Sequence, residues 1–279
     1  NIMRALAAAT SSAEAAHQAT LAALPLAAPM FVRRLDAALA ATAGAGEGAD
    51  EGAAAAIAGC TAPLEVLLRR TPLPEPAEQL ARPLFGLLAA LDRRSEYATQ
   101  LVLTSVTAML RAAQPGSAGA AVGGAAVAAA LVEHFNARLL FAQLVDPERP
   151  QVAKHALEVV KAAVPLLPEE TLERVVPHFA SVSRRALQHE HHGAALAAVE
   201  RAVGVLVPLF VRRGLQLRPL LRGWVTLVLQ APPAQWPALL GALVGKASSD
   251  EHLHCVVSSL LVAHSLRAAQ AAAPPAREA

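Results

Sequence analysis

The clearest pattern of apolar and polar positions lies in residues 150–214. Over residues 154–161 (KHALEVVK) apolar residues recur at helical spacing, and the charged residues fall on the opposite face. The segment LLPEE at 166–170 predicts the end of this helix and the start of another, because proline suits a first helical position and acidic side chains favour the N-terminal end of the helix dipole. The second helix is predicted from Thr171 to about Leu187, and one of its faces carries Leu172, Val175, Val176 and Phe179.

A polar segment at residues 189–193 (HEHHG) separates this second helix from a third, predicted over residues 194–211. Helix, short turn and antiparallel helix together form the repeating unit of an α-solenoid. Units that begin near Pro150, His191 and Pro232 are about forty residues apart, which is within the period of HEAT and armadillo repeats. Because no stretch alternates as a strand does, the sequence predicts an all-α fold, and within that class an α-solenoid of HEAT-like antiparallel helix pairs.

The remaining sequence continues the same organisation, with two glycine-rich interruptions. Further helices are predicted at residues 2–24, 30–41, 63–70, 78–91, 95–113, from the second insert to about 145, 215–230, 233–246 and 250–269. We expect flexible inserts at residues 43–59 and 114–124 and a frayed tail at 271–279, since these segments have little to bury. Residue 1 is asparagine and no leader follows it, so residues 1–279 are expected to be one continuous segment of a longer solenoid.

Composition agrees with a helical protein of a reducing compartment. Hydrophobic residues make up 54% of the chain, many of them alanine, whereas aromatic residues make up 3%, and alanine favours helices over strands. Charged residues, at 16%, are scarce enough to indicate extensive burial or coverage by partners. The long uncharged runs at residues 112–132 and 223–245 are interrupted by glycine or proline, so neither predicts a membrane span. Two cysteines, Cys60 and Cys255, do not make a disulfide framework.

Three short motifs invite a chemical interpretation, and none predicts an active site. The segment GALVGKAS at 241–248 has one residue too few for a phosphate-binding loop and follows a predicted helix, not a strand. The histidines at 189–192 are adjacent, so they do not converge easily on one metal ion. His252 and Cys255 share a helix face while His254 points elsewhere. We therefore expect no enzyme activity, no cofactor and no metal.

Paired arginines are the most suggestive polar feature. They occur at 33–34, 69–70, 93–94, 184–185 and 212–213, mostly at the ends of predicted helices, where a cation complements the C-terminal dipole. In a solenoid such ends line up along one edge, and a row of arginines there would contact RNA phosphates or an acidic partner. The candidate contacts are Arg93, Arg94, Arg184, Arg185, Arg212, Arg213, Arg218 and Arg222. Aromatic stacking partners are nearly absent, which argues against sequence-specific reading of single strands.

A colinear series of segments from about residue 80 to 261 resembles one family. The segments are PLFGLL at 83–88, EYATQLVL at 96–103, FN at 135–136, LLPEETLERVVPHF at 166–179, VERAVGVLVPL at 199–209 and WPALLGALV at 236–244. Together they resemble the C-terminal half of the large HEAT-repeat protein of the small-subunit processome, the family of U3 small nucleolar RNA-associated protein 10, also called HEAT repeat-containing protein 1. This chain departs from the family in its many alanines, its glycine-rich inserts and its histidine-rich loop at 189–192.

The resemblance implies a nucleolar scaffold without enzymatic activity. Its implied role is to support pre-rRNA processing toward 18S rRNA, and transcription of ribosomal DNA. Its implied partners are other proteins of the early transcription-linked subcomplex, and pre-rRNA and U3 small nucleolar RNA directly or indirectly, with no membrane and no small-molecule substrate. Two alternatives stay open: another HEAT adaptor, such as a karyopherin-like transport receptor or a chromatin or cytoskeletal scaffold, and an enzyme with a site at the histidine clusters. A transport receptor would be expected to have acidic inner faces, whereas this chain has a net charge of +2.

Overall fold

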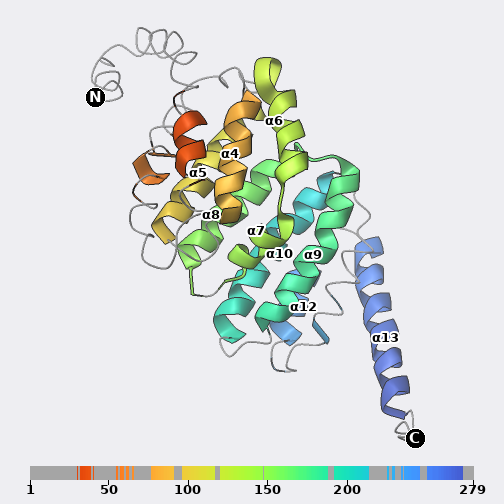
Figure 1. Ribbon diagram of the computed structural model, residues 1–279. Helices are drawn as coiled ribbons and strands as arrows, with labels where there is room; N and C mark the ends of the chain where they lie inside the picture. Colours follow the sequence, from red (N-terminus) through yellow and green to blue (C-terminus); the bar gives the residue numbers. More distant parts are fainter. Residues whose placement is uncertain are drawn as a thin grey trace, which may run out of the picture. The chain divides into compact units, whose positions relative to one another are not determined.

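The computed structural model confirms an all-α fold for the residues that it describes (Figure 1). These are 30, 32–38, 40, 55, 57–59, 61, 62, 65, 77–90, 96–116, 120–146, 148–187, 192–213, 225, 228, 229, 234, 236–245 and 250–272. Over them the chain forms helices and turns, without a strand. It divides into two compact units, one of Asn1–Leu144 with Glu148–Thr171 and one of Val145–Pro147 with Leu172–Ala279. The helix predicted at residues 2–24 lies outside the described residues, as do most positions of 63–70 and 215–230.

The first unit is built around α5. Its helices are α4 (Ala77–Ala90), α5 (Glu96–Ala113), α6 (Ala120–His134), α7 (Ala137–Leu144) and α8 (Pro150–Ala163). Helix α5 contacts α4, α6 and α8, while α4 also contacts α6, and α7 contacts α8. Eleven residues of α5 are buried, among them Val102, Leu103, Val106 and Met109, so apolar side chains cover more than one face of this helix. Such a helix needs neighbours on several sides, and the contacts of α5 supply them.

One long helix was expected to run up to Val145, and the structure corrects that prediction. The chain bends by 82° between Gly123–His134 and Ala137–Leu144, so α6 and α7 are separate helices. The backbone N–H of Leu139 donates to Oδ1 of Asn136 at 3.0 Å, and the N–H of Leu140 donates to the carbonyl oxygen of Asn136 at 3.1 Å. Asparagine is a favoured N-cap because its side chain accepts from a free amide of the first turn. Asn136 therefore starts α7.

The second glycine-rich insert is shorter than predicted. Helix α6 begins at Ala120 and includes Gly123 and Gly124, both of which are buried. The alanines around them favour the helix, and α6 contacts α4 and α5. The turn itself contains Gly116, whose φ of 90° is a conformation that favours glycine. The N–H of Gln114 donates to the carbonyl oxygen of Arg111 at 3.3 Å in the same turn.

The first predicted insert also ends earlier than expected. Ala55 and residues 57–59 are helical, and the helix continues at Thr61 and Ala62, whereas residues 43–54 lie outside the described part of the chain. Ile57 is fully buried, which explains why this end of the insert is ordered into a helix. The hydroxyl of Thr61 donates to the carbonyl oxygen of Ile57 at 2.7 Å. The hydroxyl of Ser105 donates to the backbone carbonyl oxygen of Thr61 at 3.0 Å. These bonds connect the short helix to α5.

Polar side chains join α5 to α8 at the surface of the first unit. The carboxylate of Glu158 pairs with Arg111, and its other oxygen accepts from Nζ of Lys161 at 2.7 Å. Nearby, the side-chain amide of Gln114 donates to the carbonyl oxygen of Ala162 at 3.2 Å. Exposed ion pairs of this kind contribute little each, because water screens them.

Glu158→Gln is expected to lower the free energy of unfolding by at most about 1 kcal/mol, since it removes the charge that Arg111 and Lys161 share. Urea denaturation at low and high salt measures the effect, which should shrink in 1 M NaCl. Asp36→Asn, at an exposed carboxylate, is the control and should have no salt-dependent effect. A loss for Glu158→Gln that salt does not change would contradict an electrostatic origin.

The second unit contains the later part of the stretch 150–214 that first suggested a repeat, whereas α8 of that stretch belongs to the first unit. Its helices are α9 (Glu169–Leu187), which enters this unit at Leu172, α10 (His192–Arg212), α12 (Trp236–Val244) and α13 (Asp250–Ala272). Leu172, Val175 and Phe179 are buried, as the helical pattern predicts. Helix α12 contacts both α10 and α13. Ala271 and Ala272, which were expected to be frayed, are the last residues of α13.

Among the described residues, no single helix has both the length and the hydropathy to cross a membrane. The helices Gly123–His134 and Ala137–Leu144 reach that length only together, across their 82° bend.

Candidate partner-binding surface

Arg212 and Arg213 are the two predicted contact residues whose side chains the structure describes. Arg212 is the last residue of α10 and Arg213 follows it, and both are exposed. The backbone N–H of Arg213 donates to the carbonyl oxygen of Leu209 at 3.2 Å, so the helical geometry extends through this residue. The prediction of a basic pair at a helix C-terminus is thus confirmed here, and the pair complements the negative end of the α10 dipole.

The other predicted contacts cannot be placed as side chains. Arg184 and Arg185 lie in the last turn of α9, again at a helix end, with side chains outside the described part. Arg93, Arg94, Arg218 and Arg222 lie wholly outside the described residues. Their alignment along one edge stays a prediction.

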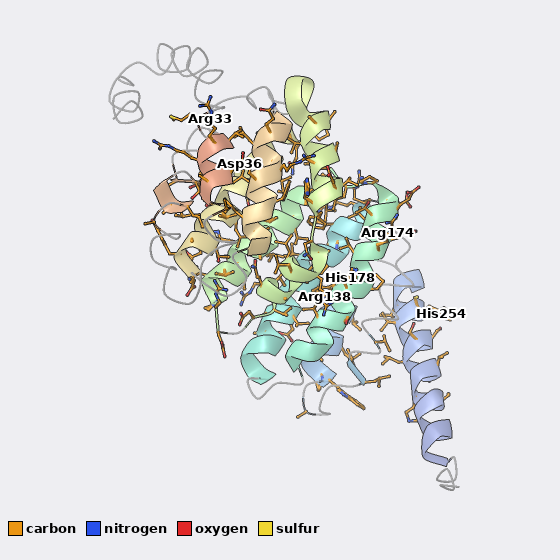
Figure 2. All side chains as sticks on the ribbon, viewed as in Figure 1. Arg33, Asp36, Arg138, Arg174, His178 and His254 are labelled. Carbon is orange, nitrogen blue, oxygen red and sulfur yellow. The ribbon has the colours of Figure 1, made fainter. Side chains whose placement is uncertain are left out.

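Arg33 and Arg34 differ from the pattern expected of the doublets. Both are exposed, but helical residues continue after them to Ala38 and Ala40, so they do not lie at a C-terminal helix end (Figure 2). Dipole complementarity therefore does not account for this pair.

Most of the other described basic side chains of the first unit have polar partners. Arg82 on α4 lies 3.6 Å from the carboxylate of Glu133 on α6, and Arg111 and Lys161 share Glu158. The guanidinium of Arg149 donates to the hydroxyl of Thr99 at 3.3 Å. A cation that is paired with a carboxylate displaces fewer counterions from a polyanion, so Arg82, Arg111 and Lys161 are poor candidates for RNA contact. These pairs were not predicted from the sequence, which was searched for arginine doublets. Only the pair of Glu158 and Lys161 has a sequence signal, because the two residues are three positions apart on one helix.

Helix α9 presents a mixed surface with acidic residues first. Glu169, Glu170, Glu173, Arg174 and His178 are exposed along its first two to three turns, and Figure 2 labels Arg174 and His178. The glutamates of the first turn complement the positive end of the helix dipole, as the sequence pattern predicts. A surface of alternating charge suits protein partners better than a phosphate backbone.

The structure describes only part of the motifs that were considered as metal, thiol or phosphate sites. His254 is exposed, with its ring Nε2 3.4 Å from the hydroxyl oxygen of Ser258, and Cys255 is a half-buried free thiol. No group of three or more histidine, cysteine, aspartate or glutamate side chains gathers as a metal site among the residues described. The N–H of Gly245 donates to the carbonyl oxygen of Gly241 at 2.8 Å, so residues 241–245 form a helix end, as predicted, and not an open phosphate cradle.

The described residues thus define an all-α protein whose first unit joins α5 to α8 and α4 to α6, helices that are not consecutive in the chain. Comparison with protein-family models, with curated proteins and with solved structures finds no match.

Proposed function

We propose that this chain is a segment of a HEAT-like α-solenoid that serves as a non-enzymatic scaffold of the nucleolar small-subunit processome. In this role it binds neighbouring proteins of the early subcomplex through helix surfaces and supports maturation of pre-rRNA toward 18S rRNA and transcription of ribosomal DNA. The proposal rests on the colinear resemblance of residues 80–261 together with the helix contacts of the first unit.

The contact pattern of the first unit is the observation that carries the proposal. If α6 and α7 count as two halves of one bent helix, the unit contains two consecutive helix pairs, α4 with α5 and α6–α7 with α8. The first helices of the pairs contact each other, α4 with α6, and so do the second helices, α5 with α8. Neighbouring repeats of a solenoid bury their apolar faces in this way, by packing first helix on first helix and second helix on second helix.

The spacing of the helices supports the same interpretation. Helix α4 begins at Ala77 and α6 at Ala120, which are about 43 residues apart, and α8 begins at Pro150 and α10 at His192, about 42 residues apart. Both distances fall within the HEAT and armadillo range. In this arrangement α8, which begins at Pro150, is the second helix of its pair, so the unit start predicted near Pro150 falls in the middle of a pair.

Affinity purification of the tagged protein, with sequencing of the bound RNA and identification of the bound proteins, tests the proposal. Recovery of pre-rRNA with U3 small nucleolar RNA and early processome subunits is the expected result. Recovery of transport cargo, chromatin or cytoskeletal proteins without pre-rRNA would refute the processome role and support another HEAT adaptor.

A double variant, Arg212→Glu with Arg213→Glu, tests direct contact with RNA. We expect binding to a transcript of the 5′ external transcribed spacer to weaken, and the slope of log K against log salt to fall by about two, since each lost phosphate contact removes about one. Filter binding at several salt concentrations measures both quantities. The matched control is Arg33→Glu with Arg34→Glu, a doublet that is also exposed, which should leave the slope unchanged. Equal slopes for both variants and the wild type would mean that RNA reaches this segment only through proteins.

A further inference from the structure

An apolar stripe on α13 faces away from the core of its own unit. Leu253, Val257 and Leu261 are 42%, 47% and 63% exposed, although each is large and apolar. Another side of the same helix carries Val256, which is buried, and α13 contacts α12. The helix therefore packs against its unit without using the stripe, and solvent-exposed apolar side chains at regular spacing mark an interaction surface.

An ionisable residue extends the stripe at each end. Asp250 stands seven residues before Val257 and His264 seven residues after it, and both are exposed. At 100° per residue, Asp250, Leu253, Val257, Leu261 and His264 fall within an arc of about 80°, and the stripe is about 21 Å long. This spacing is the heptad-like seam by which two helices pack side by side.

The apolar residues of the stripe are arranged symmetrically about Val257, whereas its two polar end residues differ in chemical character. Leu253 and Leu261 stand four residues on either side of Val257, whereas Asp250 is an acid and His264 an N–H donor. We propose that α13 is a homodimer contact, in which the stripe packs against the same stripe of a second copy of this chain, antiparallel and related by a two-fold axis through Val257.

In this arrangement every residue of the stripe meets a suitable partner. Val257 lies against Val257 of the second copy, and Leu253 against Leu261. Asp250 lies opposite His264, whose ring N–H donates to a carboxylate in either its neutral or its charged form. Because the contact is isologous, the Leu253–Leu261 and Asp250–His264 pairs each occur twice, and the Val257 pair on the axis occurs once.

Charge complementarity favours an antiparallel pair with a second copy over a parallel pair of two copies and over an apolar groove on another protein. A parallel pair would set Asp250 against Asp250, and like charges at adjoining helix positions repel. A uniformly apolar groove would leave the Asp250 carboxylate without a donor. The contact spans three to four helical turns, so we expect a dimer of modest affinity, with a Kd in roughly the micromolar range.

Sedimentation velocity of the 279-residue chain over a range of concentrations is the first test. A concentration-dependent dimer is expected for the wild type. Val257→Lys should weaken dimerisation at least about tenfold, because it places two ammonium groups at the two-fold axis. The matched control is Val262→Lys on the same helix: Val262 is 60% exposed but lies about 140° around the helix from Val257, outside the stripe. Far-UV circular dichroism verifies that both variants keep their helix.

Cysteine cross-linking tests the register. In a background with Cys60→Ser and Cys255→Ser, Val257→Cys should form a disulfide-linked dimer on mild oxidation. Leu261→Cys alone should not, whereas an equimolar mixture of Leu253→Cys and Leu261→Cys should give the mixed dimer. Cross-linking of Leu261→Cys with itself would indicate a parallel pair and overturn the proposal.

An exchange of the end residues tests charge complementarity. Asp250→His and His264→Asp should each weaken the dimer, and the double variant should restore it, because the acid and the donor merely trade places. Single changes also alter the helix dipole, so restoration in the double variant is the decisive result. A wild-type chain that stays monomeric up to about 100 μM, well above the expected Kd, refutes the proposal and leaves the stripe to a different protein.

Discussion

Phe141→Ala is expected to lower the free energy of unfolding of the first unit by about 3–5 kcal/mol. Phe141 is fully buried in α7 and is among the largest fully buried side chains described. Truncation removes the transfer free energy of the ring and leaves a cavity that neighbouring helices fill only in part. Urea denaturation followed by far-UV circular dichroism measures the loss.

The control for this variant is Tyr97→Ala, which removes an aromatic ring that is 64% exposed on α5. Its effect should stay within about 0.5 kcal/mol, as for most surface substitutions. A similar loss at both positions would contradict the burial that distinguishes them.

Gln143→Met is expected to raise the free energy of unfolding by about 1–3 kcal/mol. The Gln143 side chain on α7 is 4% exposed, and neither its amide nitrogen nor its amide oxygen has a hydrogen-bond partner among the residues that the structure describes. In the unfolded chain both atoms bond to water, so folding removes their solvation without replacing it. Methionine has a similar length and flexibility and no amide to desolvate.

The same substitution at an exposed position supplies the control. Gln151→Met on α8 should change the free energy of unfolding by no more than about 0.5 kcal/mol. If Gln143→Met destabilises the protein, the amide is satisfied in solution, for example by a bound water.

Helix positions were predictable because amphipathic spacing and helix-start signals agree with each other. The predicted helices at 78–91 and 95–113 correspond to α4 and α5 within a residue or two, and Pro150 begins α8 as a proline at a first helical position should. Leu172, Val175 and Phe179 were assigned to a buried face from spacing alone, and they are buried. In these segments local propensity and tertiary packing favour the same structure.

The errors occurred where a tertiary contact overrides local composition. Gly123 and Gly124 suggest a flexible segment, but they are buried within α6, where close packing on α4 and α5 compensates for the poor helix propensity of glycine. Ile57 orders the end of a glycine-rich stretch because it alone there has a large side chain to bury. Asn136 was a readable N-cap signal in the middle of an apolar run, and it marks the bend that was missed.

The candidate surface was less predictable than the fold. A doublet such as Arg212–Arg213 at a helix end can be read from sequence, since helix ends are local features. Whether an arginine is neutralised depends on residues far away in the chain, as Arg111 and Glu158 show. The stripe on α13 was not identified from the sequence because its apolar residues have the same spacing as a core face, and only their exposure in the folded chain separates the two.

The small residues of α6 have a thermodynamic consequence for the first unit. The buried positions of this helix include Gly123, Gly124 and Ala130 beside Val127 and Leu131, and the three small residues hide little apolar area. The heat capacity of unfolding scales with the apolar area that becomes exposed, so this part of the unit contributes little to it. A small heat-capacity change flattens the dependence of the free energy on temperature. Per residue, α6 is therefore expected to contribute less to this temperature dependence than α5, whose buried side chains are larger.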